Sequence, residues 1–176
     1  MVKALLAHRR VVTEHSEAAR KLLRKEFGKK LPDRRVQLSF LESLYLVERK
    51  TLVVVDAQKK SVSFDRLLRL AKQGTKDFWM SYVVFRDLRN QGYVVKTGLR
   101  FGADFRVYAQ TTKRTRHAKW IVHPVRESQT LTWREFSAKN RVAHSVQKHL
   151  LIAVVDDEED VTYWDVTWLR RTGASQ

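Results

Sequence analysis

The chain has 176 residues, 35 Lys and Arg against 19 Asp and Glu, a formal net charge of +16 and no cysteine. The missing cysteines exclude disulfides and cysteine-ligated zinc, and the six histidines show no metal-binding spacing such as His-Glu-x-x-His. A positive charge this large, in a chain that is 43% hydrophobic, indicates a folded protein that binds a polyanion, usually nucleic acid.

Two small domains are predicted, and the first spans residues 1–73. One or two short strands open it, and an amphipathic helix follows over Ser16 to Phe27, with Gly28 as its stop. Ser39-Phe-Leu-Glu42 is a capping-box pattern, which predicts the start of a second helix. After it we expect a β-branched strand and a short helix, at 51–56 and 64–71.

The second domain is predicted over residues 74–176. Its first helix is expected at 76–90, closed by Gly92, and a later helix starts at the capping box Thr132-Trp-Arg-Glu135. Five strands are predicted around these helices, at 93–96, 99–108, 117–122, 149–155 and 161–168. Helices that flank a mixed sheet make the fold class α/β, with an α+β first domain.

Three ionisable residues lie at the ends of these elements. From Leu99 to Tyr108 the odd positions are apolar and the even ones mostly polar, so Tyr108 falls on the polar face of a strand. His117 is expected on the more polar parity of the next strand. On the later helix Lys148 is expected to share a polar face with Arg141, His144 and Ser145, while Val142 and Val146 turn to the core with Ala138 and Ala143.

Tyrosine, histidine and lysine are the ionisable groups needed to cut RNA through its own 2′-hydroxyl without a metal. Taken singly, each has a simpler interpretation. A tyrosine at a strand end is often half-buried packing, a histidine in a strand is often structural, and a lysine at a helix C-terminus interacts with the helix dipole.

Three sequence blocks, in order along the chain, decide between these interpretations. They are Leu38-Ser-Phe-Leu-Glu-Ser-Leu-Tyr-Leu46, Asp87-Leu-Arg-Asn-Gln-Gly-Tyr-Val-Val-Lys-Thr-Gly-Leu-Arg-Phe-Gly-Ala-Asp-Phe-Arg-Val-Tyr108 and Arg141-Val-Ala-His-Ser-Val-Gln-Lys148. With these blocks the chain resembles the archaeal tRNA-splicing endonuclease family, also called tRNA-intron endonucleases, over nearly its whole length. The resemblance implies a small α+β N-terminal domain and a C-terminal catalytic domain of restriction-endonuclease-like fold.

The resemblance also implies an activity and its residues. Members cleave precursor tRNA at bulge-helix-bulge sites without a metal or other cofactor, leaving a 2′,3′-cyclic phosphate and a 5′-hydroxyl. Tyr108 matches the general base of the family, His117 the general acid and Lys148 the group that stabilises the transition state. Arg141 matches one of two cations that hold an extruded bulge base, and Trp168 occupies the place where many relatives have the second.

The acidic run Asp156, Asp157, Glu158, Glu159 and Asp160 is the second feature with an implied role. In this family an acidic loop at this place inserts into a basic cleft of a neighbouring subunit. The implied partners are precursor tRNA together with self-association in a homotetramer, or a second, structural subunit in a heterotetramer. An isolated charge run is otherwise usually a solvated turn.

Two other functions are alternatives to this one. A metal-dependent nuclease of restriction-like fold would use Asp104, but no Glu-x-Lys follows at the expected place. A non-catalytic subunit of the same endonuclease would be expected to lack the triad, and here all three positions are filled. With no signal peptide and no apolar run long enough to cross a membrane, a soluble, cytoplasmic protein is expected.

Overall fold

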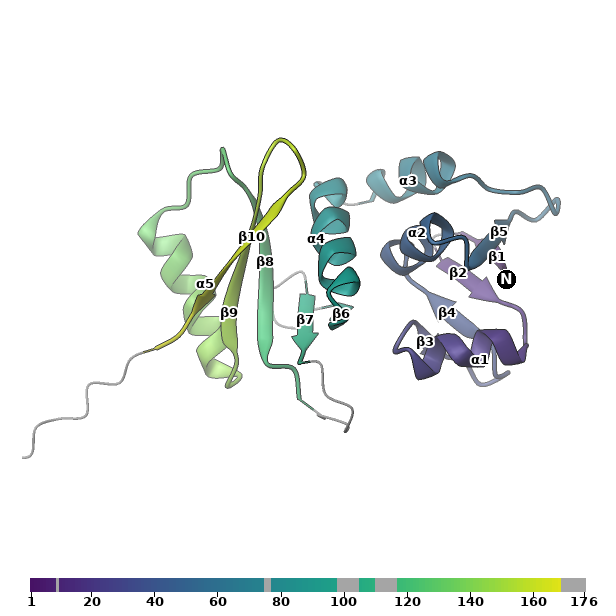
Figure 1. Ribbon diagram of the computed structural model, residues 1–176, viewed down its shortest axis with the longest axis horizontal. Helices are drawn as coiled ribbons and strands as arrows, with labels where there is room; N and C mark the ends of the chain where they lie inside the picture. The colour runs from purple at the N-terminus through teal and green to yellow at the C-terminus, as the bar shows by residue number, and fades with distance from the viewer. Residues whose placement is uncertain (9, 75–76, 98–104, 110–116, 169–176) are drawn as a thin grey trace, which may run out of the picture. The chain divides into compact units, whose positions relative to one another are not determined.

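The computed structural model describes residues 1–176 except 9, 75–76, 98–104, 110–116 and 169–176. Two compact units divide the chain, Met1–Trp79 and Met80–Gln176. Each is built on one five-stranded sheet that mixes parallel and antiparallel pairs, with helices packed against it (Figure 1). This architecture confirms the predicted α/β class.

The sheet of the N-terminal unit has the strand order β3-β4-β2-β1-β5. Only β1 and β5 pair in parallel, and the other neighbours are antiparallel. The strands are β1 (Val2–Ala7), β2 (Arg10–Thr13), β3 (Lys29–Lys30), β4 (Val36–Leu38) and β5 (Leu52–Val55). The helices are α1 (Glu17–Arg24), α2 (Phe40–Glu48) and α3 (Phe64–Lys72).

The capping box at the start of α2 is confirmed, and its acid also organises the preceding loop. The Ser39 side chain accepts from the Glu42 amide, while the Glu42 carboxylate accepts from the Ser39 amide at 2.9 Å. The same carboxylate accepts from the Gly28 amide at 2.7 Å. One buried acid therefore joins the start of α2 to the loop that follows α1.

The predicted end of the first helix is wrong by three residues. Helix α1 ends at Arg24, and the left-handed residue that closes it is Glu26, with φ 61°. Gly28 lies beyond this turn, with φ 69°, and a Cβ there would approach Val36 to 2.5 Å. Glycine is therefore required at position 28 for close approach to β4, and it does not terminate the helix.

The sheet of the C-terminal unit has the strand order β10-β9-β8-β7-β6, in which only β8 and β9 are parallel. Helix α5 connects these two parallel strands. The strands are β6 (Val94–Thr97), β7 (Phe105–Tyr108), β8 (Trp120–Arg126), β9 (His149–Val155) and β10 (Val161–Val166), and the helices are α4 (Phe78–Asn90) and α5 (Trp133–Ser145). Residues 99–104 of the predicted 99–108 strand lie outside the described residues.

Helices α4 and α5 cover opposite faces of this sheet (Figure 1). Phe85 of α4 packs against Phe105 of β7, with ring centroids 6.2 Å apart. On the other face Ala143 of α5 is fully buried in a cluster with Ile121, Val125, Leu150 and Ile152. Because β8 and β9 are covered on both faces, most of their residues are buried, as expected for the central strands of a sheet with helices on both sides.

The start of α5 was predicted correctly, but its core face only in part, since Ala143 and Val146 pack inward as expected. Thr132 and Glu135 form the expected capping box. Val142, however, is 37% exposed, and Ala138 is exposed as well. The side chains that pack inward are Phe136, Ala143 and Val146.

Helix α4 ends as predicted. Gly92, with φ 88°, takes the left-handed position, and the Tyr93 amide donates back to the Leu88 carbonyl at 3.0 Å. Among the helices that the structure describes, none is both long and apolar enough to span a membrane.

Candidate active site

Tyr108 and His117 come from the adjoining ends of β7 and β8. Tyr108 is the last residue of β7 and is half-buried. The Lys119 amide donates to the Val107 carbonyl at 2.9 Å, which ties the residue before Tyr108 to the chain two residues after His117. His117 was predicted inside a strand, but β8 begins only at Trp120, and His117 lies exposed in the bend before it.

Lys148 reaches the same end of the sheet through the parallel strand β9. The His149 amide donates to the Lys119 carbonyl at 3.0 Å, and His149 pairs with Trp120 in the register of the two strands. Lys119 thus hydrogen-bonds to both neighbouring strands. These two bonds bring the chain next to Tyr108, His117 and Lys148 together, although the three residues are widely separated in sequence.

The sequence predicted Lys148 on the polar face of α5. The structure contradicts this, because the helix ends at Ser145 and Lys148 lies beyond it. The chain turns through Gln147, with φ 56°, so the Gln147 amide donates to the His144 carbonyl at 3.0 Å and the Lys148 amide to the Ala143 carbonyl at 2.9 Å. This is the Schellman arrangement of a helix C-terminus. It anchors the backbone of Lys148 to Ala143, which is fully buried.

A polar cluster that the sequence analysis missed joins β8, β9 and β10 at this end of the sheet. The Asp165 carboxylate accepts from the Trp120 indole N–H at 3.0 Å, and its other oxygen lies 3.0 Å from His149 Nδ1. The Lys119 ammonium lies 4.4 Å from the centre of the Trp120 ring. A charged residue in the otherwise apolar and aromatic strand 161–166 was the available signal.

Tyr163 is another tyrosine of this unit, and its surroundings do not suit a general base. Its hydroxyl donates to Asp87 Oδ2 of α4 at 2.6 Å, and Gln91 donates to the same oxygen. Burial, followed by the hydrogen bond to the Asp87 carboxylate, raises the pKa of Tyr163 well above its ordinary value. Tyr163 therefore stays neutral and holds β10 against α4.

Arg141 and Trp168 both lie next to the exposed His144. Arg141 is exposed on α5, one turn before His144. The His144 ring packs against the Trp168 indole, with centroids 4.6 Å apart and planes inclined by 31°. Trp168 lies beyond β10, which ends at Val166, and is 50% exposed. The sequence had placed it within the strand.

The acidic run forms the turn between β9 and β10, and its five members differ. Asp156 closes the turn, because its carboxylate accepts from the Asp160 amide at 2.9 Å. Glu159 pairs with Arg86 of α4 at 3.1 Å. Asp157, Glu158 and Asp160 are exposed. The outward negative charge therefore comes from these last three residues.

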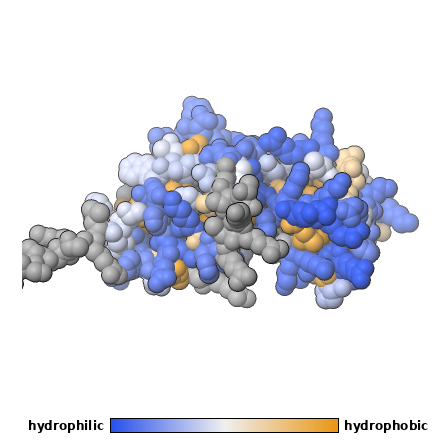
Figure 2. All heavy atoms as spheres, turned by 60° about the horizontal axis from the view of Figure 1, so that its bottom comes forward, coloured by the Kyte–Doolittle hydropathy of each residue, from blue (hydrophilic) through white to orange (hydrophobic). Residues whose placement is uncertain are grey.

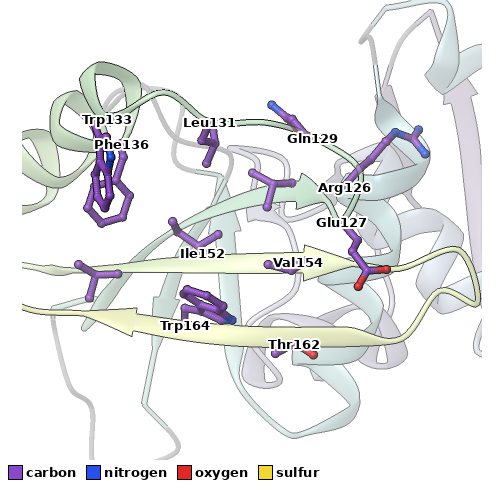
Figure 3. Close-up of a pocket in the computed structure, with 12 residues that line it drawn as sticks. Arg126, Glu127, Gln129, Leu131, Trp133, Phe136, Ile152, Val154, Thr162 and Trp164 are labelled. Carbon is purple, nitrogen blue, oxygen red and sulfur yellow. The ribbon is translucent and has the colours of Figure 1, made fainter.

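An apolar groove of about 610 Å³ lies between α5 and the adjacent face of the sheet (Figure 3). Two aromatic side chains at its border are largely exposed, Trp133 at 82% and Trp164 at 61%. Trp164 belongs to β10, the edge strand of the sheet. The groove is lined by Val125, Arg126, Glu127, Gln129, Leu131, Trp133, Phe136, Ile152, Val154, Thr162, Trp164 and Val166.

Across the described part of the chain, no group of three or more His, Asp or Glu side chains is arranged to hold a metal ion. Asp104, the acid of the alternative metal-dependent function, lies outside the described residues.

Comparison with known proteins covers both units. The family model "tRNA intron endonuclease, N-terminal domain" matches residues 2–68, and "tRNA intron endonuclease, catalytic C-terminal domain" matches residues 78–163.

Similar curated proteins are full-length matches. A tRNA-splicing endonuclease of Methanothermobacter thermautotrophicus is 39% identical over 96% of this chain and 98% of its own length. One from Pyrococcus furiosus is 37% identical over 97% and 98% of the two chains, and one from Pyrococcus abyssi is 34% identical over the same shares. With matches of this extent to both domains, the chain belongs to the tRNA intron endonuclease family.

Proposed function

We propose that this chain is a tRNA-intron endonuclease that cleaves precursor tRNA at bulge-helix-bulge sites. The nucleophile is the 2′-hydroxyl next to the scissile phosphate, and the products are a 2′,3′-cyclic phosphate and a 5′-hydroxyl. The observation that supports this most directly is the pair of hydrogen bonds made by Lys119, which draws the chain beside Tyr108, His117 and Lys148 to one end of a sheet.

Each residue of the proposed triad has one task in a single displacement at phosphorus. Tyr108 accepts the proton of the 2′-hydroxyl as the 2′-oxygen bonds to phosphorus. His117 gives a proton to the 5′-oxygen as its bond to phosphorus breaks, because an imidazolium can act as a general acid. Lys148 offers a positive charge to the non-bridging oxygens, where negative charge grows in the transition state.

Arg141 and Trp168 are proposed to bind an extruded bulge base. A guanidinium and an indole both stack on any base, and stacking on an aromatic side chain contributes about 1–3 kcal/mol. The His144 ring packed on Trp168 supports this proposal, because it restrains the indole while half of the side chain stays exposed.

Subunit association is proposed through two features of the C-terminal unit. The apolar groove beside β10 carries two exposed tryptophans, an arrangement typical of protein interaction sites. Asp157, Glu158 and Asp160 offer negative charge that complements a basic chain. The partner is a second copy of this chain or a homologous structural subunit.

The decisive experiment is cleavage of a bulge-helix-bulge RNA in the presence of a chelator. His117→Ala and Lys148→Ala should each lower the single-turnover rate about 10²-fold or more, with RNA affinity nearly unchanged. Tyr108→Phe should act similarly. His15→Ala, which removes an exposed histidine of the N-terminal unit, serves as the control and should cleave at the wild-type rate.

Substrate chemistry tests the nucleophile separately. An RNA with one 2′-deoxyribose at the cleavage site should bind and resist cutting. Cutting of that RNA would eliminate attack by the 2′-hydroxyl, and wild-type rates in all three triad variants would eliminate the assigned residues. Activity that appears only when divalent metal is added would support the metal-dependent alternative.

A further inference from the structure

Positive charge is concentrated in the N-terminal unit. Residues 1–79 carry 19 Lys and Arg against nine Asp and Glu, a net charge of +10, while residues 80–176 carry 16 against ten, a net charge of +6. The unit without the proposed triad is therefore the more basic one. Its charge is not explained by the cleavage chemistry.

A single segment, residues 20–35, accounts for most of this excess of positive charge. Between residues 20 and 35 the chain has eight basic side chains and two acids, a net charge of +6. They lie on α1 and at its C-cap, on β3, and in the turn between β3 and β4, and all eight are exposed. Figure 2 shows this face as largely hydrophilic, in a view that brings the bottom of Figure 1 forward. We call this the basic surface; it consists of Arg20, Lys21, Arg24, Lys25, Lys29, Lys30, Arg34 and Arg35.

Acidic neighbours compensate only part of the basic surface. Glu17 alone pairs with both Arg20 and Arg24, at 2.8 and 2.7 Å, and Asp33 pairs with Arg35 at 2.7 Å. Among the described residues, no acid forms an ion pair with Lys21, Lys29, Lys30 or Arg34. A strong positive potential therefore remains over α1 and the β3–β4 turn.

Protection of a sheet edge explains part of the pattern and not the rest. Strand β3 is an edge strand, and lysines on such strands prevent pairing with other chains. This accounts for Lys29 and Lys30. It does not account for Lys21 on a helix or for Arg34 in a turn.

The composition of the basic surface indicates which part of a nucleic acid it can bind. Base recognition in RNA relies on aromatic side chains that stack on bases. From residue 17 to residue 38 the only aromatic residue is Phe27, which is buried at 6% exposure and packs on Tyr45. The surface therefore offers charge to phosphates and no aromatic platform for bases.

We propose that the basic surface binds the phosphate backbone of the double-helical parts of the RNA substrate. The inference rests on the proposed function for the identity of the RNA, and it adds a second contact region outside the catalytic unit. Binding there is independent of sequence, so it raises affinity for the precursor as a whole and contributes no choice of cleavage site.

The test measures RNA binding and its dependence on salt. The variant K21Q/K29Q/K30Q/R34Q removes the four cations that lack an acidic partner and leaves the ion pairs of the surface intact. Its affinity for full-length precursor tRNA should fall more than tenfold at low salt. The slope of log affinity against log salt should become shallower by about 3, because each lost phosphate contact contributes about 0.7–0.9.

A matched variant separates a local surface from net charge. K3Q/K50Q/K59Q/K60Q removes four other exposed lysines of the same unit, and it should change the slope by less than one third as much. Equal losses in the two variants overturn the proposal. So does a shift of K21Q/K29Q/K30Q/R34Q to smaller species in sedimentation, which would make the surface a protein interface. A wild-type chain that binds precursor with this salt dependence but never cuts it contradicts the proposed function and leaves the binding surface standing.

Discussion

His123 is the one histidine of the C-terminal sheet that lies in its interior. It is 4% exposed on β8, and its Nδ1 lies 3.5 Å from the Lys139 ammonium of α5. Burial, and secondarily the charge of Lys139, lowers the pKa of His123 to about 4 from an ordinary 6.5. The imidazole is therefore neutral in the folded chain at physiological pH.

Acid should destabilise the fold through His123. Between pH 6.5 and pH 4 the unfolded chain binds a proton on this residue that the folded chain does not, so stability is complete above pH 6.5 and falls as the pH drops. The loss amounts to about 3 kcal/mol at most. His123→Phe should flatten this part of the dependence in urea unfolding across pH 4–7. Lys139→Gln should flatten it much less, because burial is the larger cause; a curve for His123→Phe with unchanged steepness would contradict the assignment.

Individual residues also show what the sequence could and could not predict about the candidate site. Tyr108 was placed correctly at a strand end, because its strand alternates in polarity. Asp165 was missed, because its partners Trp120 and His149 lie on other strands. A side chain whose role depends on distant partners leaves no periodic signal in its own segment.

Among the elements, helix starts were predictable, and a helix end was predictable only where a glycine marks it, as Gly92 does after α4. Ser39 and Thr132 cap the starts of α2 and α5 through side-chain hydrogen bonds. Because these bonds depend on residue type, the sequence predicts them. Helices α1, α2 and α5 instead end on left-handed residues that are not glycine, namely Glu26, Lys50 and Gln147. Because no glycine marks these ends, the sequence extended α1 and α5 too far.

The left-handed conformation of Gln147 after α5 can be tested by substitution. An L-residue in the left-handed region is less favourable than glycine, so Gln147→Gly should stabilise the C-terminal unit by about 0.5–1 kcal/mol. Gln147→Val should destabilise it, because a β-branched side chain tolerates this conformation worse, and it should also slow cleavage by displacing Lys148. Urea unfolding and single-turnover rates measure both effects. Equal stability of the glycine and valine variants would show that the turn does not hold this conformation in solution.

At the scale of the whole molecule, composition predicted a polyanion-binding protein but not where its charges lie. The order of the strands was equally out of reach, because the pairing of β8 with β9 joins segments separated by all of α5. What periodicity and capping supplied was the number and kind of most elements. The resemblance of three sequence blocks supplied the family, and the matches to both family domains confirm that membership.

Association through the β9–β10 turn is the prediction that belongs to this scale. Asp157→Asn, Glu158→Gln and Asp160→Asn together should shift the assembled protein toward smaller species, increasingly at high salt, with cleavage falling in parallel. The fold should change little, since exposed charges contribute roughly 0–1 kcal/mol. Sedimentation of the lone chain, and of the chain mixed with a structural subunit, measures this. The control variant combines Glu14→Gln, Glu48→Gln and Asp65→Asn. If the assembly stays intact in both variants, the β9–β10 turn is only solvent-exposed and does not hold subunits together.

The parallel pairing of β8 with β9 also sets the order in which an active molecule can arise. A parallel pair cannot close as a hairpin, so the chain must complete the whole crossover through α5 before His149 can bond to Lys119. During synthesis, Tyr108 and His117 leave the ribosome well before Lys148 does. A nascent or truncated chain that ends before β9 therefore cannot bring the three residues of the proposed triad together.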